Sequence, residues 1–527
     1  MRRSVGSRGF AGLLLGCAAA LVPGGRAAAE DPYAEAPSYL RALSARVTIQ
    51  PLLTVGQTLP LTGGDEGQTF RFVGRPDGLG IYPLLDPAAE GDEKAKPKKG
   101  QTRFVLIVAH ELGEDEGGPA GPLPRGARLS EILLDWSRAR YLPRPFSVPR
   151  LFAASGRPAI ERVFTGDDPE LVEPVTRGFA KFCSGFLADD RVGFDRPVFL
   201  TGEESDGPHT FDPRGGQVWA VVEGSAFALP RFGRAAWENV VVAPFTDTRT
   251  VAFGLEDASA PGQDSQLYLY LGEKQPEADD VLARNGLRGG RVHVLCPDDS
   301  ARGSEAAFRT RGDSLAVHWA ELEWDLSDSD FEAAARAAGA FQFIRIEDGA
   351  LDPKMPGRLY FATTGKAGSA NPRGRLYRLR FDPESPLAGA WLDILLDGTE
   401  GVVHPDNVGV NGDGQIAIQE DPGEGLRDLG LPRDSSIWIY DVRDGELARI
   451  ATMDREAARI HALAADPANE IVAQEDYPGS WESSGIVDAS ALLGRGTWIC
   501  SVQAPSLRVA PAGQLVAGGQ ILRITYR

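Results

Sequence analysis

Residues 418–423 read IQEDPG and residues 472–479 read VAQEDYPG, so a short apolar run stops twice at Gln-Glu-Asp. A Pro-Gly pair follows within two residues and predicts a turn. Apolar runs stop at carboxylates six times in all, at His110-Glu111, Gly202-Glu203-Glu204, Glu256-Asp257, Glu347-Asp348, Glu420-Asp421 and Glu475-Asp476. This repetition indicates that one structural unit recurs along the chain.

Short β-type runs bounded by Gly, Pro, Asp and Asn dominate the chain beyond residue 101. Typical runs are RFVLIVAH, GQVWAVVEG, SQLYLYLG and SSIWIYDV. Helical patterns are few: an Ala-rich stretch at 329–340, with Ser327 to Ser329 available as a cap, and a second candidate at 169–182. Such a chain is typical of a β-sandwich, a barrel or a propeller. The six repeats favour an all-β, six-bladed propeller with irregular blade insertions.

The composition limits the possible partners. The chain has 527 residues and a formal net charge of −19, so it would repel nucleic acid overall. The same excess of carboxylates supplies ligands for cations. We expect a monomer that binds a small molecule.

The first 29 residues predict a signal peptide rather than part of the fold. A basic start with Arg2 and Arg3 precedes an apolar run over 10–22, and small residues that suit cleavage follow. We therefore expect a periplasmic or secreted protein. The Arg2-Arg3 pair leaves twin-arginine export open, and lipid anchoring at Cys17 ranks second. No later segment has the 18 apolar residues of a membrane span.

The mature chain divides into two predicted parts. Residues 30–100 form an N-terminal extension and the start of the propeller, and residues 101–527 form the metal-binding propeller. This mature chain keeps three cysteines, Cys183, Cys296 and Cys500, so at least one thiol is unpaired. Whether Cys296 pairs with Cys500 stays open.

The carboxylate clusters predict metal binding. In a propeller the inner strands surround one central channel, so equivalent strand ends converge there. Many carboxylates in one funnel would repel each other or take up protons unless cations neutralise them. The alternative, that turns merely favour Asp and Glu, explains one cluster more easily than six.

Four stretches resemble the PhoX-type alkaline phosphatase family, and the resemblance extends from about Phe104 to the end of the chain. They are Phe182-Cys183-Ser184-Gly185 followed by Leu200-Thr201-Gly202-Glu203-Glu204, Arg345-Ile346-Glu347-Asp348-Gly349-Ala350, His404-Pro405-Asp406-Asn407, and Glu482-Ser483-Ser484-Gly485-Ile486-Val487-Asp488. Each is short, but their order makes the set specific.

The resemblance implies a six-bladed propeller that hydrolyses phosphate monoesters with Fe3+, two ions, and Ca2+, two or more. It implies Cys183 as the iron-ligating thiolate and Arg345 as the phosphate-binding arginine, the two residues predicted to be catalytic. The further iron ligands it implies are Glu203 or Glu204, Glu238 and Asp406. The calcium ligands it implies are Glu111, Glu347, Asp348, Glu420 and Asp421. A thiolate with carboxylates suits iron, and oxygen ligands alone suit calcium.

Two departures from the family pattern leave other functions open. Ala109-His110-Glu111 stands where the family commonly has Asn-His-Glu, and Val502-Gln503-Ala504-Pro505 stands where relatives often have Gln-Ala-His. One alternative is a non-catalytic, calcium-stabilised propeller that binds a ligand or partner. Another is a calcium-only, lactonase- or phytase-like propeller, which would tolerate replacement of Cys183.

Overall fold

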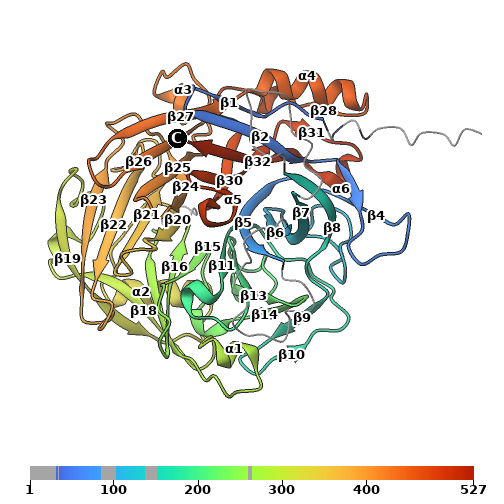
Figure 1. The fold of residues 1–527 in the computed structure, drawn as a ribbon. Coiled ribbons are helices and arrows are strands. Elements are labelled where there is room, and N and C mark those ends of the chain that lie inside the picture. The colour runs from blue at the N-terminus through green and yellow to red at the C-terminus, as the bar shows by residue number, and fades with distance from the viewer. Residues whose placement is uncertain (1–30, 32, 34, 85–102, 137–150, 259–263) are drawn as a thin grey trace, which may run out of the picture.

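The structure is a computed structural model that describes residues 31, 33, 35–84, 103–136, 151–258 and 264–527. The predicted signal peptide, with Arg2, Arg3 and Cys17, lies outside the described residues. The described chain forms six blades of antiparallel strands around a common axis (Figure 1). The prediction of an all-β, six-bladed propeller is therefore confirmed.

Each blade is a sheet whose first strand lies innermost. Blade 1 contains β5 (Pro76–Pro83), β6 (Arg103–His110), β7 (Arg128–Asp135) and β8 (Phe152–Pro158). Blade 2 contains β11 (Phe182–Ala188), β12 (Val198–Glu203), β13 (Val218–Val222) and β14 (Ser225–Ala228), extended by β9 (Arg162–Thr165) and β10 (Glu170–Leu171). Blade 3 contains β15 (Trp237–Val242), β16 (Arg249–Glu256), β17 (Leu267–Glu273) and β18 (Arg291–Pro297).

The other three blades follow the same order. Blade 4 contains β20 (Ile346–Leu351), β21 (Arg358–Thr363), β22 (Arg375–Phe381) and β23 (Ala390–Leu396), and β19 (Ser314–Leu322) joins its outer edge to blade 3. Blade 5 contains β24 (Pro405–Val410), β25 (Gln415–Glu420), β26 (Ser436–Asp441) and β27 (Leu447–Met453), extended by β1 (Leu40–Ala42). Blade 6 contains β29 (Glu482–Asp488), β30 (Thr497–Ala504), β32 (Gly518–Tyr526) and β2 (Val47–Thr54).

The two ends of the described chain close the ring. Strand β2 pairs antiparallel with β32, from Val47 opposite Tyr526 to Thr54 opposite Gln520. An early strand thus completes the last blade, and β5 then begins blade 1. This pairing covers the outer edge of β32 and links the start of the described chain to its end. The ring of blades is therefore closed, and the six inner strands keep fixed positions around the axis.

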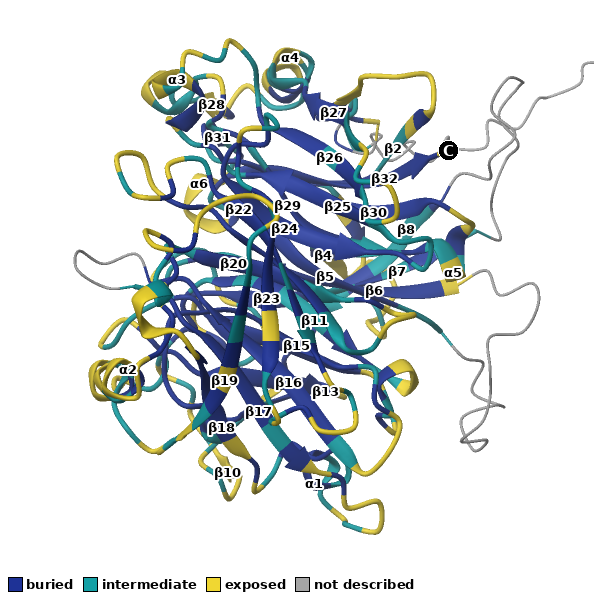
Figure 2. Cartoon of the chain, turned by 90° about the vertical axis from the view of Figure 1, so that its left-hand side faces the viewer, coloured by how far each residue is buried: buried dark blue, intermediate teal, exposed yellow. Residues whose placement is uncertain are grey.

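Both faces of a blade are buried, which explains the continuous apolar runs. In β6, Phe104, Leu106 and Val108 pack in the apolar cluster shared with blade 6, whereas the alternate residues Val105 and Ile107 pack in the cluster shared with blade 2. Side chains alternate between the two faces of a strand, so two buried faces require apolar residues at every position. Figure 2 shows the result, with buried strands inside and exposed residues on loops and helices.

Helices and minor strands lie at the edges. The helices are α1 (Val281–Arg284), α2 (Asp328–Ala337), α3 (Gly425–Asp428), α4 (Arg455–Ala465), α5 (Ser490–Leu493) and α6 (Ala512–Leu515), and the minor strands are β3 (Thr58–Pro60), β4 (Thr69–Arg71), β28 (Glu470–Ile471) and β31 (Leu507–Arg508). Helix α2 confirms the helix expected at 329–340, and the Ser327 side chain accepts a bond from Asp330 N as its cap. The helix expected at 169–182 is wrong: Pro174 and Gly178 interrupt it, β10 forms within the stretch, and β11 begins at its last residue. Among the described residues, no helix has the length and apolar content to span a membrane.

Candidate metal centre

The six inner strands present one ligand-type side chain each at the place where they begin. These residues, called here the inner-strand ring, are Asp77, Cys183, Glu238, Glu347, Asp406 and Glu482. In all six blades the pairing of the inner strand with its neighbour shifts register within the first five residues. Such bulges bend a strand and redirect a side chain. The fold therefore repeats one ligand position six times around the axis.

Four overlapping groups of possible ligands occupy this ring within the described part of the chain. They are Asp77–Glu111–Cys183, Cys183–Glu204–Glu238, Glu238–Glu347–Asp406 and Asp406–Asp421–Glu482. In each group the ligand atoms all lie within 4.8 Å of one another. Because Cys183, Glu238 and Asp406 each belong to two groups, the four groups form one continuous arc through the six blades.

The electrostatics of the ring call for cations. Burial raises the pKa of all six ring side chains well above the ordinary value, and the negative charges of neighbouring ring members or adjacent carboxylates raise it further. Three buried carboxylate oxygens, Asp77 Oδ1, Glu238 Oε2 and Asp406 Oδ1, have no hydrogen-bond partner. Buried acceptors without partners are costly unless a cation or water satisfies them. The donor set, one thiol among carboxylates, therefore fits metal ions.

In two of the carboxylate pairs that end the second strand of a blade, the two side chains have different roles. Glu204, directly after β12, belongs to a ligand group with the ring residues Cys183 and Glu238, but Glu203 accepts bonds from Ala180 N at 3.1 Å, Phe211 N at 2.8 Å and Trp219 Nε1 at 3.2 Å. Successive strand residues point to opposite sides, so only one member of a pair can face the ring. Glu203 therefore has a structural role, which differs from the ligand role predicted for it.

The same division corrects the prediction for blade 5. Asp421 joins Asp406 and Glu482, whereas Glu420 is fully buried against the scaffold. Glu420 Oε1 accepts from Val403 N at 2.9 Å and Trp438 Nε1 at 2.9 Å, and both of its oxygens pair with Arg433. Glu420 thus fixes the loop before β24 to the blade and is not a member of the ring.

A layer of polar side chains lies beneath the ring, and Asp348 belongs to this layer and not to the ring. Asp348 Oδ1 accepts from Asn239 Nδ2 at 2.6 Å, and Oδ2 accepts from Val408 N at 3.2 Å. Asp348 thereby ties together the inner strands of blades 3, 4 and 5, and burial raises its pKa to about 7. It clamps the strands under the ring and is not in any of the four ligand groups. On the other side, Asn407 Nδ2 donates to Ser184 Oγ, which donates to Glu238.

One predicted carboxylate pair does not reach the ring at all. Glu475 lies on a short 3-10 helix, Ala473–Glu475, and pairs with Arg508 at 2.7 Å. Asp476 pairs with Arg455 at 2.6 Å and Arg459 at 2.9 Å, so its charge is already neutralised. The ring position of blade 6 is taken by Glu482 instead.

Two cationic side chains lie beside the ring. Arg345, two residues before Glu347, binds Asp257 through Nε at 3.2 Å and Nη2 at 2.8 Å and also contacts Glu347 Oε1 at 3.0 Å. Lys181, two residues before Cys183, contacts Glu204 at 3.2 Å and Glu111 at 3.9 Å. Both residues have left-handed backbone, with φ of 57° and 45° respectively. Such strain in residues other than glycine often accompanies a functional position.

The two departures from the family pattern have defined places. Ala109 is fully buried in the apolar cluster between blades 1 and 2. Gln503 Nε2 donates to Asp77 Oδ2 at 2.7 Å and to Glu111 Oε2 at 2.9 Å. An amide therefore orients two carboxylates of the first ligand group. The described cysteines, Cys183, Cys296 and Cys500, are all free, so Cys296 and Cys500 do not pair.

Sequence reasoning found seven of the residues in the ligand groups and missed two. Cys183, Glu111, Glu204, Glu238, Glu347, Asp406 and Asp421 lie in the groups. Asp77 and Glu482 were not predicted as ligands, and Lys181 beside the ring was not singled out; Asp257 belonged to a predicted cluster but had no role assigned. A signal for the missed ring members does exist in the triplets that begin the inner strands: PDG, FCS, WEN, IED, PDN and WES.

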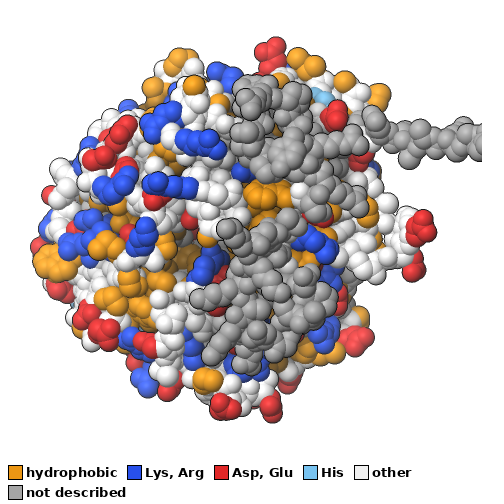
Figure 3. Space-filling model, in the orientation of Figure 1, with side chains coloured by type: hydrophobic (Ala, Val, Ile, Leu, Met, Phe, Trp, Pro, Cys, Tyr) orange, Lys and Arg blue, Asp and Glu red, His pale blue; other side chains and the backbone are white. Residues whose placement is uncertain are grey.

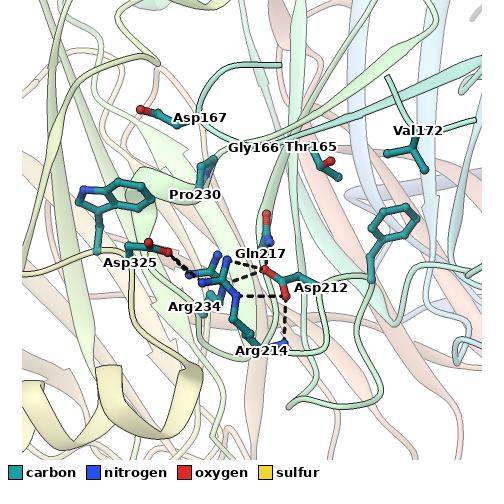
Figure 4. A pocket seen from close by; sticks show the side chains of 12 residues that line it. Thr165, Gly166, Asp167, Val172, Asp212, Arg214, Gln217, Pro230, Arg234 and Asp325 are labelled. Atoms are coloured by element: carbon teal, nitrogen blue, oxygen red, sulfur yellow. Dashed lines mark hydrogen bonds and ion pairs between the residues drawn. The ribbon is translucent and has the colours of Figure 1, made fainter. Parts of the chain in front are cut away.

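A cavity on the outer part of blades 2 and 3 is a separate feature (Figure 4). It measures about 510 Å³ and contains no ring residue. Asp212 pairs with Arg214 at 3.2 Å and with Arg234 at 2.9 Å, and Asp325 pairs with Arg214 at 3.0 Å. Its charges are therefore internally balanced, unlike those of the ring.

Comparison with known proteins indicates which class of protein this chain resembles. Residues 223–473 match the family model described as alkaline phosphatase PhoX, and no curated protein matches the chain in sequence. The structure is similar to that of Pseudomonas fluorescens PhoX in complex with vanadate, a transition state analogue, with a TM-score of 0.61 and 14% identity over 94% of this chain and 97% of that one. It also matches the soluble aldose sugar dehydrogenase from Escherichia coli in the apo-form, with a TM-score of 0.32 and 10% identity over 91% of this chain and 100% of that one, a likeness too distant to inform function.

The family match and the propeller fold define a hydrolase of the phosphatase class. Acidic clusters able to hold metal ions lie where its inner strands begin. The match over residues 223–473, which include the motifs at 345–350 and 404–407, confirms the resemblance of this chain to the PhoX alkaline phosphatase family.

Proposed function

We propose that the chain is an exported phosphatase that hydrolyses phosphate monoesters at a diiron-calcium site in the central channel of the propeller. The observation that supports this most is the arc of four ligand groups, each with its ligand atoms within 4.8 Å of one another. A purely structural acidic cluster would pair its carboxylates with basic residues, as Asp476 does. The ring leaves three buried oxygens without partners.

The chemistry of the donors suggests which ions go where. Cys183 belongs to the two groups of blades 1 to 3, where a soft thiolate with carboxylates suits iron. The groups of blades 3 to 6 contain oxygen donors only, and Asp406, Asp421 and Glu482 suit calcium. We propose two Fe3+ and two or more Ca2+, held by the group members and without Glu203, Asp348 or Glu420.

The bound ions would supply Lewis-acid stabilisation of the charge that develops on the phosphoryl oxygens. The protein's own part is to bind and orient the phosphate. Asp257 and Glu347 fix the guanidinium of Arg345 through Nε and Nη2, which leaves its Nη1 edge available to a phosphate oxygen. Lys181 Nζ, held by Glu204 and 41% exposed in its side chain, adds a second positive charge. Negative charge on its neighbours raises the pKa of Lys181, so it stays protonated at alkaline pH.

Vanadate links this proposal to a relative. The Pseudomonas fluorescens PhoX structure was obtained with vanadate, described as a transition state analogue. If the ring of this chain binds a phosphoryl group in the same way, vanadate should inhibit turnover competitively. Arg345→Ala should weaken that inhibition, because it removes the guanidinium that binds the equatorial oxygens.

The decisive experiment combines metal analysis with activity. Purified protein is analysed by elemental mass spectrometry and assayed on a chromogenic phosphomonoester at alkaline pH, before and after chelation. We expect iron and calcium together and turnover that chelation removes. Glu347→Gln should lower both metal content and activity, whereas Glu475→Gln, a carboxylate outside the ring, should leave both unchanged.

The same measurements decide between the alternatives. Calcium without iron or hydrolysis would indicate the non-catalytic propeller. This alternative stays open because Ala109, which is buried, stands where the family commonly has an asparagine. Calcium alone with activity that survives Cys183→Ser would indicate a lactonase- or phytase-like enzyme. We also propose a periplasmic or secreted monomer that acts on a small phosphate ester, which fractionation of cells and size-exclusion chromatography would test.

A further inference from the structure

The cavity of about 510 Å³ on the outer part of blades 2 and 3 has the size of a small-molecule site. Four parts of the chain meet there: the segment around β9 and β10, the loop between β12 and β13, the connection from β14 to β15, and the loop after β19. They supply apolar surface from Val172, Phe211, Pro230 and Trp324. The guanidinium of Arg231 lies 4.6 Å from the centre of the Trp324 ring and stabilises the position of that ring. The cavity therefore offers apolar walls as well as polar groups.

A buried polar network fixes one side of this cavity. Arg234, whose side chain is 2% exposed, donates from Nε to Asp212 Oδ2 at 2.9 Å and from Nη1 to Leu326 O at 2.9 Å. Gln217, which is 5% exposed, donates from Nε2 to the same Asp212 oxygen at 2.9 Å. Because these side chains are buried and bonded to one another, they hold their positions before any ligand arrives, which lowers the cost of binding.

One atom of this network is left without a bond. Among the described residues, the buried oxygen Gln217 Oε1 has no hydrogen-bond partner. The amide nitrogen has to face Asp212, since an amide oxygen in its place would repel the carboxylate. Figure 4 shows the Gln217 side chain extending into the cavity, with its oxygen turned away from Asp212. A buried acceptor without a partner is costly, so the cavity calls for a hydrogen-bond donor at this point.

The charges of the cavity balance one another. Its three carboxylates pair with three arginines in or beside it: Asp212 with Arg214 and Arg234, Asp325 with Arg214, and Asp167 with Arg231. Figure 3 shows acidic and basic side chains interspersed on the face in view as well, without a large area of one sign. An ion would have to break such pairs, whereas an uncharged ligand that both donates and accepts hydrogen bonds leaves them intact.

We propose that this cavity binds a neutral carbohydrate. A sugar hydroxyl would donate to Gln217 Oε1, and neighbouring hydroxyls would accept from arginine and donate to aspartate, because a hydroxyl does both. The C–H faces of a sugar ring are apolar and match the surface of Phe211 and Trp324. The proposal does not rest on the phosphatase centre, since the cavity contains no ring residue.

The test titrates glucose, galactose, maltose and cellobiose into the full-length protein as purified, by saturation-transfer NMR and calorimetry. These sugars carry no phosphate group, so the proposed phosphatase centre has no charged group to bind. We expect saturable binding of at least one sugar, with an affinity that added salt hardly changes. Gln217→Met keeps the length of the side chain and removes the acceptor, so it should weaken binding about fivefold or more.

An exposed carboxylate gives a second variant and a matched control. Asp325→Ala removes a side chain that is 52% exposed, so the fold should persist, and binding should weaken about threefold or more. Asp298→Ala removes a carboxylate that is 55% exposed and pairs with His318 outside the cavity. This control should change the affinity less than twofold, and melting temperatures check that all three variants fold.

Four results would overturn the proposal. The first is the absence of saturable binding by all four sugars, which would leave water as the partner of Gln217. The second is binding of adenosine but of no sugar, which would indicate a nucleoside site. The third is unchanged sugar affinity in both Gln217→Met and Asp325→Ala, which would place the sugar elsewhere. The fourth is equal weakening by Asp298→Ala, which would indicate a response to the loss of any surface carboxylate.

Discussion

Replacing Glu420 tests the division of the carboxylate pairs most directly. Glu420 and Asp421 are adjacent in sequence, yet the structure gives Glu420 to the scaffold and Asp421 to the ring. Glu420→Gln keeps the shape of the side chain and one oxygen acceptor for Val403 N and Trp438 Nε1. It removes the charge that Arg433 contacts at 2.5 and 2.7 Å. Arg433, whose side chain is 14% exposed, then keeps its hydrogen bonds to Gly401 O and Asp434 O but loses its carboxylate partner.

The size of the effect follows from this contact. Removing one partner of a buried ion pair costs about 3–5 kcal/mol, because the remaining charge is desolvated without compensation. Since Gln retains one acceptor, we expect the lower end, about 3 kcal/mol of unfolding free energy. Asp421→Asn should instead leave the metal-free protein as stable as before or slightly more stable, because burial raises the pKa of that carboxyl and disfavours its charged form.

The assay compares both variants after chelation, by urea unfolding followed through tryptophan fluorescence, and then measures calcium content after reloading. We expect Glu420→Gln to lose stability and keep its calcium, and Asp421→Asn to keep stability and lose calcium. Calcium loss in Glu420→Gln without a drop in metal-free stability would refute the assignment. It would show that Glu420 is a ligand, as the resemblance implied.

Three further predictions concern the ring. Cys183→Ser should remove iron and retain calcium, since the oxygen-only groups are intact; elemental analysis shows the ratio. Arg345→Lys should lower kcat/KM for a phosphomonoester about 10- to 100-fold with metal content unchanged, because a lysine cannot keep the contacts of Nε and Nη2 with Asp257 and Glu347 and also reach the phosphate, so a charge-assisted hydrogen bond worth about 1.5–3 kcal/mol is lost. In metal-free protein the pKa values of the ring carboxylates are raised, and the pKa of Glu204 beside them is raised to about 7, so the folded state holds these protons more tightly than the unfolded state. Their stabilising effect is complete below about pH 4 and is lost as the pH rises through neutrality, so melting temperatures of chelated protein should fall over this range while those of loaded protein do not.

The sequence was sufficient for the fold because its signals are local and repeated. Apolar runs such as β6 are buried on both faces, so their composition alone indicates a blade strand. Closure by β2 could not be read in the same way, since pairing between residues about 480 positions apart leaves no local signal. Helix α4 was missed although its sequence carries the local signals: Asp454 caps it, and its Ala-rich sequence with Arg and Glu favours a helix.

The candidate site was only partly predictable because adjacent carboxylates in a strand point to opposite sides of it. Glu203 and Glu204 are both glutamates, so the sequence does not distinguish their roles. Only the pairing of β11 with β12 determines which of the two side chains faces the ring. Asp77 lies in none of the quoted motifs, and Glu482, although it begins the fourth resembling stretch, was assigned no ligand role. Glu475-Asp476 matched the pattern but lies at the end of a 3-10 helix instead of a strand, so no strand directs it toward the ring.

If the proposed ions bind, one repeated position of the ring would serve two kinds of metal. The six blades supply one cysteine, two aspartates and three glutamates at equivalent places, so the backbone sets the circle and the side chains set the chemistry. Among the ring residues the thiol occurs in blade 2 alone. The two ligand groups that suit a softer metal therefore lie between blades 1 and 3, and the two oxygen-only groups, which suit a hard cation, lie between blades 3 and 6. Arg345 begins blade 4, which contributes Glu347 to the first oxygen-only group. A phosphate bound by Arg345 would therefore lie near the junction of the two ends, within reach of ions of both kinds.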